Sequence, residues 1–260
     1  NNLKNIPDLE RSLSRISSSR GSPKDLVLIS KGFLNIYEIY EDLTKLNKDL
    51  NKPYPLINII QNLEIDYSLF FNIQSAFKTD VPLSAKEGGF IKDGYNTKLD
   101  HLRHLRDNEF NEIINLQKKY SEVSKVNSLK IKNNKVLGYH IEVRAIHDLS
   151  LRNIQQFIHR QSTAQTSRFT TIELNEIENQ IQNSFYEATK IELDIYNAFT
   201  EQIINIGNEI LNIASSISEL DISMMVANQA QIRNYIRPNI SDDKTLEIID
   251  GRHPVVENQM

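Results

Sequence analysis

The chain has no cysteine among its 260 residues. Disulfide bonds and thiolate chemistry are therefore excluded, and a reducing cytoplasm is the location we expect. No apolar run comes near the ~18 residues that a transmembrane helix requires, and the first residues, NNLKNIPDLERSL, lack the profile of a signal peptide. We therefore expect no contact with a membrane.

Glycine and proline are absent from residues 96–125, so nothing in this stretch interrupts a helix. Apolar residues recur there at helical intervals, at Leu99, Leu102, Leu105, Phe110, Ile113, Leu116, Tyr120 and Val123. The pattern predicts a helix of roughly 45 Å. Three shorter helices are predicted upstream, from about Pro7 through Ile16, from Pro23 to about Asn47, and over residues 65–77.

A second long helix is predicted downstream, and its apolar residues alternate at spacings of four and three. They are Phe199, Ile203, Ile206, Ile210, Ile213, Ile217 and Leu220. If the helix is continuous from Thr171 to about Ile222, it is roughly 75 Å long, with Gly207 as its one interruption. Such a heptad seam packs either within its own chain or against a partner chain as a coiled coil.

Between these helices, residues 127–170 change to a period of two. Leu129 and Ile131 alternate with lysines, and the stretch from Leu137 to Val143 alternates in the same way. Asn133-Asn134 lies between them, which predicts a β-hairpin with a type I′-like turn. Phe157 and Ile158 are candidates for a third strand. Two antiparallel helices that carry a small sheet are the simplest assembly.

The same insert is basic, whereas the rest of the chain is acidic. It holds seven Lys and Arg against two acids, a net +5, while the whole chain is −4, so the remainder carries −9. Arg160 and Arg168 lie in a run of small hydrogen-bonding residues, HRQSTAQTSR, at residues 159–168. Such residues bind nucleic-acid phosphates without reading bases. The alternative interpretation is a solvated cap that keeps the insert soluble.

Other patterns do not support a catalytic or metal site. Gly89 and Gly94 have the spacing of a phosphate-binding loop, but Tyr95-Asn96 follows where Lys and Ser/Thr are required. His101 and His104 lack a third ligand at suitable spacing and have arginine neighbours. The acids form no pair that suggests acid–base catalysis, so we expect no enzyme activity within these residues.

Five stretches, in order along the chain, match the patterns of one known family. They are IPDLER with SPKDL at residues 6–26, GFIKDGYN with LDHLR at 89–103, LKI with VLGYHIEV at 129–143, YIRP at 235–238 and GRHPVVE at 251–257. On these residues the chain resembles the bacterial MutS family of DNA mismatch-repair proteins. Where that family commonly has RRQTLKNAER, this chain has HRQSTAQTSR, so Arg160, Gln161 and Arg168 match while Ala164 and Gln165 replace Lys and Asn.

The resemblance implies a mostly α fold, with a helical core and two long antiparallel lever helices that carry a small antiparallel β-rich clamp tip. Residues 1–104 would be the core with the outgoing lever helix, and 105–191 the clamp, with its tip at about 127–170. Residues 192–240 would be the returning lever helix and core, and 241–260 the first strand of an ATPase domain.

The resemblance also implies a function in mismatch repair. The tip would bind the backbone of double-stranded DNA, and these residues would hold neither ATP nor Mg, which a longer parent would bind elsewhere. That parent would be a homodimer that works with other mismatch-repair proteins. The candidate DNA-binding residues are Lys130, Lys132, Lys135, Arg160, Gln161, Gln165, Thr166 and Arg168. The competing interpretation is a structural coiled-coil module with no role in nucleic-acid binding.

Overall fold

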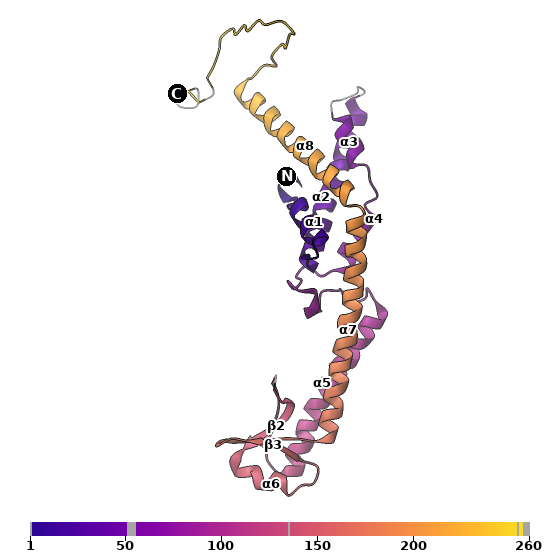
Figure 1. Ribbon diagram of the computed structural model, residues 1–260, viewed down its shortest axis with the longest axis vertical. Helices are drawn as coiled ribbons and strands as arrows, with labels where there is room; N and C mark the ends of the chain where they lie inside the picture. Colours follow the sequence, from indigo (N-terminus) through magenta and orange to yellow (C-terminus); the bar gives the residue numbers. More distant parts are fainter. Residues whose placement is uncertain (1, 51–55, 135, 254, 257–260) are drawn as a thin grey trace. The chain divides into compact units, whose positions relative to one another are not determined.

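The computed structural model describes residues 2–50, 56–134, 136–253 and 255–256, with the side chains of residues 49 and 50 excepted. The chain is mostly helical, with one small antiparallel sheet (Figure 1). It divides into two compact units, Asn1–Ile217 and Ser218–Met260. A short 3-10 turn, Asn2–Asn5, precedes the first α-helix.

The first two helices confirm the predictions. The helix α1, Leu9–Ser17, starts where the side chain of Asp8 accepts a hydrogen bond from Arg11 N at 2.9 Å. Its apolar residues at helical spacing are all buried, and α1 packs on α2, Pro23–Leu50. Asp25 in the first turn of α2 accepts hydrogen bonds from both Ser22 N and Ser22 Oγ, which fixes the start of that helix.

Two short helices complete this part of the core. The helix α4, Ser68–Ala76, corresponds to the one predicted over residues 65–77, whereas α3, Ile57–Leu63, was not predicted. The rings of Phe33 on α2 and Phe70 on α4 stack with centroids 3.8 Å apart, and both side chains are fully buried. Aromatic packing therefore holds α4 against α2.

The longest helix pair is α5, Thr97–Ser124, and α7, Ile172–Asn205, which pack side by side (Figure 1). Each begins at a side-chain cap, since Asn96 accepts from Leu99 N and Thr171 accepts from Leu174 N, both at 3.0 Å. The buried residues that these helices share with the sheet form one cluster. On the helices they are Ile113, Leu116, Tyr120, Leu174, Ile177 and Ile181.

The single 75 Å helix is wrong. The helix α7 ends at Asn205, Ile206 has φ −97° and ψ 16°, and α8, Gly207–Arg233, begins at the next residue. Glycine disfavours a continuous helix because it retains more backbone freedom in the unfolded chain. The 34 residues of α7 span about 50 Å.

Most of the apolar seam is covered within the chain. Phe199, Ile203, Ile210, Ile213, Ile217 and Leu220 are all at most 9 % exposed, while Ile206 is partly exposed. Phe199 meets Phe77 edge to face, with centroids 5.8 Å apart. These side chains are therefore not available as a coiled-coil surface for a partner chain.

Four strands form the sheet, in the order β1-β2-β4-β3, and every neighbouring pair is antiparallel. They are β1, Lys130–Asn134, β2, Gly138–Arg144, β3, Ile158–Ser162, and β4, Thr166–Thr170. The strands confirm the expected hairpin and the strand at Ile158, but β4 was not predicted. Two short helical segments, Ala145–His147 and α6, Asp148–Arg152, connect β2 to the β3–β4 pair.

The turn of the first hairpin was predicted wrongly. Asn133 and Asn134 belong to β1, and Asn134 pairs with Gly138, so three residues lie in the loop. The side chain of Asn134 accepts from Val136 N and Leu137 N at 2.9 and 2.8 Å, and the positive φ of 65° falls on Gly138. Glycine accepts this positive φ without strain, and the Asn134 side chain bonds the backbone that follows it.

The helix α8 runs from the first unit into the second. By length and composition alone it qualifies as a membrane-crossing helix, which the short apolar runs did not lead us to expect. Its residues Ile210, Ile213 and Ile217 are buried in the first unit, and 28 % of its apolar stretch is buried.

In the second unit α8 ends at Arg233, and Asn234 follows in the left-handed conformation with φ 53°. Tyr235 N then donates to Ala230 O at 2.9 Å, which closes the last turn. Arg252 lies over the Tyr235 ring at 5.7 Å and donates to Arg233 O. The described residues after Arg233 form no strand, so the strand expected over residues 241–260 stays a prediction.

Candidate nucleic-acid interface

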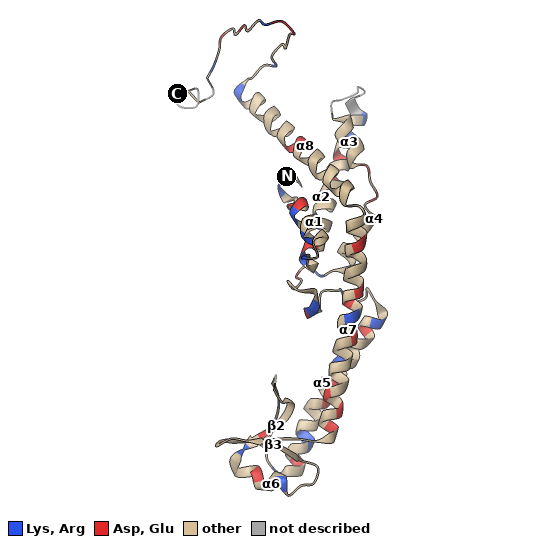
Figure 2. Cartoon of the chain, in the orientation of Figure 1, with Lys and Arg blue, Asp and Glu red and all other residues tan. Residues whose placement is uncertain are grey.

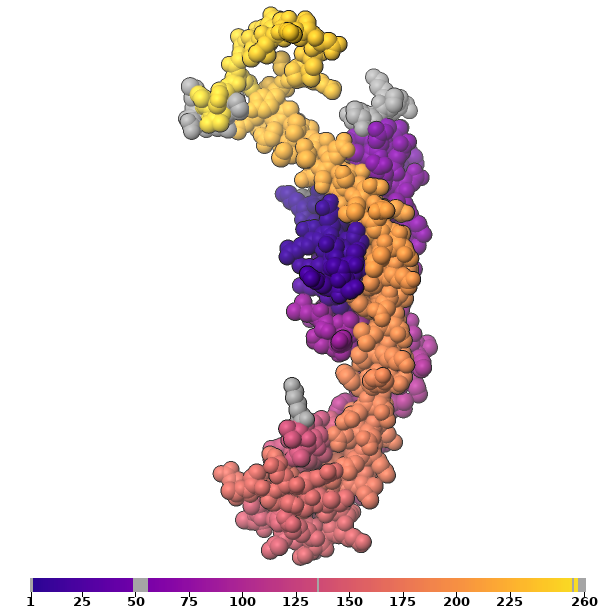
Figure 3. Space-filling view, in the orientation of Figure 1, coloured from indigo at the N-terminus to yellow at the C-terminus, as the bar shows by residue number. Residues whose placement is uncertain are grey.

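The two faces of the sheet differ in chemistry. Alternate residues of a strand point to opposite faces, and the buried Ile141, Val143 and Phe169 share one face. That face packs on α5 and α7. Figure 3 shows residues of the sheet and α6 gathered into one packed body where α5 ends and α7 begins.

The opposite face is polar. Lys130 pairs with Glu142, Glu142 pairs with Arg168, and Arg168 pairs with Gln161. Residues two positions away along each strand share this face by the same alternation. We call this set the polar sheet face, and its members are Lys130, Lys132, His140, Glu142, Arg144, Gln161, Thr166 and Arg168. Four cations and one acid give it a formal charge of +3 with His140 neutral.

The polar sheet face has a net positive charge, whereas the chain outside residues 127–170 has a net negative charge. Figure 2 shows acidic residues along α7, and both signs of charge near β2, β3 and α6. Lys130 and Arg144 are exposed and have no ion pair among those found in the described part of the chain. A surface of this kind attracts a polyanion through its phosphates rather than its bases.

Two of the cations are paired with the acid at the centre. Lys132 Nζ donates to Glu142 Oε1 at 2.7 Å, and Arg168 Nε donates to Glu142 Oε2 at 3.3 Å. Arg168 Nη1 also donates to Gln161 Oε1 at 3.1 Å. The hydrogen bond from Lys132 is the main cause that lowers the pKa of Glu142, against the opposing effect of burial.

Arg160 lies apart from this arrangement. The register of β3 shifts between His159 and Gln161, and this bulge places Arg160 beside the row of cross-strand pairs. Its side chain lines an open cavity of about 760 Å³ between the first hairpin and α7. Asn134, Asn175 and Glu178 line the same cavity, which therefore presents amides and an acid as well as the arginine.

The structure thus brings together some of the predicted residues. Lys130, Lys132, Gln161 and Arg168 share the polar sheet face, and Thr166 lies at its end opposite Arg144. Gln165 is exposed in the turn before β4, where its carbonyl accepts from Ala145 N at 2.9 Å. Lys135 lies outside the described residues.

Three members of the face were missed, His140, Glu142 and Arg144. The signal was present, because the alternation from Leu137 to Val143 also puts Glu142 and Arg144 on one side of the strand. What the sequence did not show is which residues of β4 lie beside them, since β4 itself was not predicted. The pairing of Glu142 with Arg168 therefore needed the structure.

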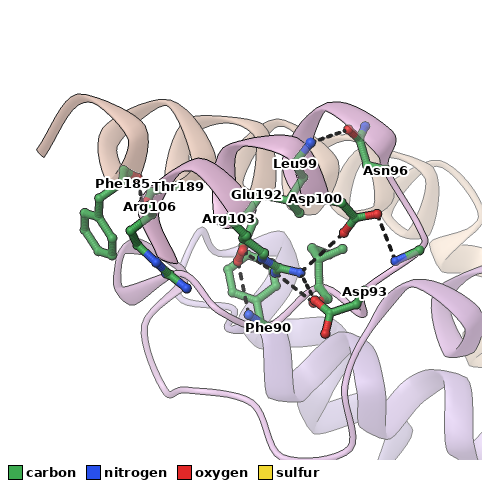
Figure 4. Close-up of polar contacts among 12 residues, drawn as sticks. Phe90, Asp93, Asn96, Leu99, Asp100, Arg103, Arg106, Phe185, Thr189 and Glu192 are labelled. Carbon is green, nitrogen blue, oxygen red and sulfur yellow. Dashed lines mark hydrogen bonds and ion pairs between the residues drawn. The ribbon is translucent and has the colours of Figure 1, made fainter. Parts of the chain in front are cut away.

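A second polar cluster lies where α5 begins (Figure 4). Glu192 on α7 is 2 % exposed and accepts from Phe90 N at 3.1 Å and from Arg103 Nη2 at 2.7 Å. Arg103 Nη2 also donates to Ile91 O at 2.9 Å, and Arg103 Nη1 pairs with Asp93. We call these contacts the junction network, because they tie the loop before α5 to both long helices.

The junction network also explains the glycine-rich loop. Gly89 and Gly94 have φ of 80° and 84°, which favours glycine at both positions. The backbone N–H groups of Phe90 and Gly94 point at carboxylates of the chain itself, Glu192 and Asp100. A phosphate would have to displace these carboxylates, so the loop does not fit a nucleotide.

The described residues contain no group of three or more His, Asp or Glu that would hold a metal ion. His101 and His104 are both exposed on α5.

Comparison with known proteins places the chain in a family. The family model described as MutS family domain IV matches residues 94–187, which include all four strands. Across 99 % of its length the chain is 37 % identical to the DNA mismatch repair protein MutS of Roseobacter denitrificans. The chain belongs to the MutS family.

Two further relatives have the same name. The proteins of Ruegeria sp. and Bartonella tribocorum are each 36 % identical, again over 99 % of this chain. The chain spans 28–29 % of the length of these three MutS relatives. The similarity therefore concerns one part of each relative and leaves most of their length unmatched.

Proposed function

We propose that this chain is the core, lever and clamp region of a mismatch-repair protein, and that its sheet binds duplex DNA by the phosphate backbone. The observation that carries the proposal is the polar sheet face, where Lys130, Lys132, Arg144 and Arg168 gather around a single acid. Membership of the MutS family supports it, since these relatives are DNA mismatch repair proteins by name.

The helices α5 and α7 would serve as the levers. Their shared buried cluster continues into the apolar face of the sheet, so a tilt of the helix pair carries the sheet with it. The junction network joins the other end of α5 to α7 and to the loop at Phe90. Motion of the core would thus reach the sheet through packed helices rather than through a flexible connection.

ATP and Mg would bind outside these residues. The glycine-rich loop does not fit a nucleotide, because the N–H groups of Phe90 and Gly94 already donate to the carboxylates of Glu192 and Asp100. The longer protein would hydrolyse ATP in another domain, act as a homodimer with further mismatch-repair proteins, and work in the cytoplasm. These statements rest on family membership alone.

The test is the salt dependence of duplex binding by the full-length protein that carries these residues. Replacing Arg160 or Arg168 by alanine should weaken binding equally for matched and mismatched duplexes and reduce the slope of log K against log salt by about 0.9 for each lost phosphate contact. Fluorescence anisotropy over a series of salt concentrations measures both quantities.

Arg152→Ala is the matched control, because it removes the same charge from the same region but from α6, where Arg152 pairs with Asp148 at 2.5 Å. It should leave the slope unchanged. Slopes that stay at the wild-type value in both Arg160→Ala and Arg168→Ala would refute binding through these side chains.

A further inference from the structure

Glu142 is the one acid among the cations of the polar sheet face. It lies on β2, between Lys130 on β1 and Arg168 on β4 in the cross-strand register. A carboxylate at the centre of a phosphate-binding surface opposes that function, because like charges repel. Its position therefore requires an explanation beyond solubility.

Both oxygens of this carboxylate are occupied. Oε1 accepts from Lys132 and Oε2 accepts from Arg168, as described above. The Glu142 side chain is 15 % exposed, while those of Lys132 and Arg168 are 53 % and 26 % exposed. The carboxylate thus lies below its two cations, which an approaching phosphate would meet first.

This geometry makes Glu142 a competitor for the groups that would bind DNA. Lys132 and Arg168 must share their donors with Glu142 or leave it when they meet a phosphate. A cation that stays paired with a carboxylate neutralises less of the phosphate charge. Fewer counterions therefore leave the DNA when the protein binds. Lys130 and Arg144 have no such partner among the ion pairs of the described residues.

We propose that Glu142 is an internal competitor of DNA phosphate for Lys132 and Arg168, and that it limits the affinity of the sheet for duplex DNA. The inference rests on the proposed function and adds a determinant of strength to it. The consequence is a surface that holds DNA through two unpaired cations and releases it readily, because two further cations return to Glu142.

The opposite role is physically possible and predicts the opposite result. Glu142 and Gln161 together orient the Arg168 guanidinium, and a preorganised arginine binds phosphate better than a mobile one. If orientation dominated, removal of the carboxylate would weaken binding. The sign of the change in affinity therefore decides between competition and orientation.

The experiment is Glu142→Gln in the full-length protein that carries these residues, with binding of a matched duplex followed against salt. Gln keeps the size of the side chain and an acceptor oxygen. Competition predicts about fivefold tighter binding at low salt, from the removal of one charge near a phosphate. It also predicts a steeper slope of log K against log salt than in the wild type, because Lys132 and Arg168 are no longer shared with a carboxylate.

Glu173→Gln is the control for the charge change. Glu173 is paired in a similar way, with Lys119 Nζ at 2.9 Å, but on the α5–α7 helix pair. It should bind duplex like the wild type. Glu142→Thr, with a residue that suits a strand, repeats the test without the amide. Weaker or unchanged binding by both Glu142 variants would overturn the proposal.

A double variant separates this inference from the proposed function. Lys132→Met with Glu142→Gln should show a smaller gain than Glu142→Gln alone, because one of the two released cations is gone. If the polar sheet face binds DNA but Glu142 does not compete, Arg168→Ala lowers the salt slope while Glu142→Gln leaves affinity unchanged. If the face does not bind DNA, none of these variants changes the slope, and both proposals fail.

Discussion

At the scale of single residues, the environment of Glu142 has a consequence for folding as well as for binding. Lys132 and Arg168 lower the pKa of this carboxyl from its ordinary value of 4.5. The folded chain therefore holds the Glu142 proton less tightly than the unfolded chain does. The stabilisation is fully present above about pH 4.5 and is lost as pH falls through the lower, folded pKa.

Glu142→Gln should accordingly lose less free energy of unfolding than the wild type between pH 5 and pH 3. Urea denaturation at a series of pH values measures the difference. The curve of the variant should be the flatter of the two over this acidic interval. Parallel curves would mean that Lys132 and Arg168 do not stabilise the carboxylate in solution.

Much of the candidate site was visible at this scale, because alternation assigns residues of one strand to faces. Lys130, Lys132 and Arg168 were chosen from the sequence and share one face. Arg160 was chosen with equal reason but lies at the bulge of β3, and one extra residue in a strand changes what a side chain faces. A bulge depends on the partner strand, so composition does not reveal it.

At the scale of elements, the helix starts were the easiest features to predict. Asn96, Thr171 and the Ser22-Pro23 pair satisfy the free N–H groups or fix the backbone of a first turn, and these are local effects. The heptad seam, by contrast, continues through Ile206 without showing the break there. Apolar spacing reports which side is buried, and the seam stays buried on both sides of the break.

The strand β4 was missed because its sequence, TSRFT, is mostly polar. Ser167 shares the apolar face with Phe169, while Thr170 lies on the opposite face, and both are buried by the fold around them. Their hydroxyls find partners in Ser162 at 3.1 Å and Asn175 at 2.7 Å. Both partners lie five residues away, on β3 and on α7, so the period of apolar residues gives no signal for this strand.

The junction network provides the prediction at this scale. Arg103 and Glu192 are 13 % and 2 % exposed in their side chains, so removing one leaves the other buried without its main partner. Arg103→Met or Glu192→Leu should each lower the free energy of unfolding by about 3–5 kcal/mol. Urea denaturation of each variant measures the loss.

The double variant Arg103→Met with Glu192→Leu should lose clearly less than the sum of the two single losses, because no unpaired charge remains buried. Glu173→Gln is the exposed comparison, where a surface pair contributes only ~0–1 kcal/mol. Additive losses in the double variant would show that Arg103 and Glu192 do not stabilise the junction as a pair.

At the scale of the whole molecule, the family match and the polar sheet face lie in the same part of the chain. The family match covers the sheet and most of the α5–α7 pair, and the wider similarity reaches nearly all of the chain. Fold class and family were both predicted from the sequence, because ordered motifs are spread over its full length. The arrangement of charge around Glu142 is a property of the assembled sheet and appears only when β1, β2 and β4 lie together.

The most direct measurement compares two variants of the full-length protein that carries these residues, each lacking four positive charges. One replaces Lys130, Lys132, Arg144 and Arg168 on the polar sheet face by glutamine. The other replaces four exposed lysines of α2 and α5, namely Lys24, Lys31, Lys98 and Lys118. The change in net charge is the same in both variants. Any difference in their DNA binding is therefore due to where the removed charges lie.

Binding of a matched duplex as a function of salt concentration decides the matter. Our account predicts that the sheet variant loses most of its salt-dependent duplex affinity, with a slope smaller by several units, while the helix variant keeps a slope near that of the wild type. Equal loss in the two variants, or a sheet variant that binds like the wild type, would contradict the claim that this face holds DNA.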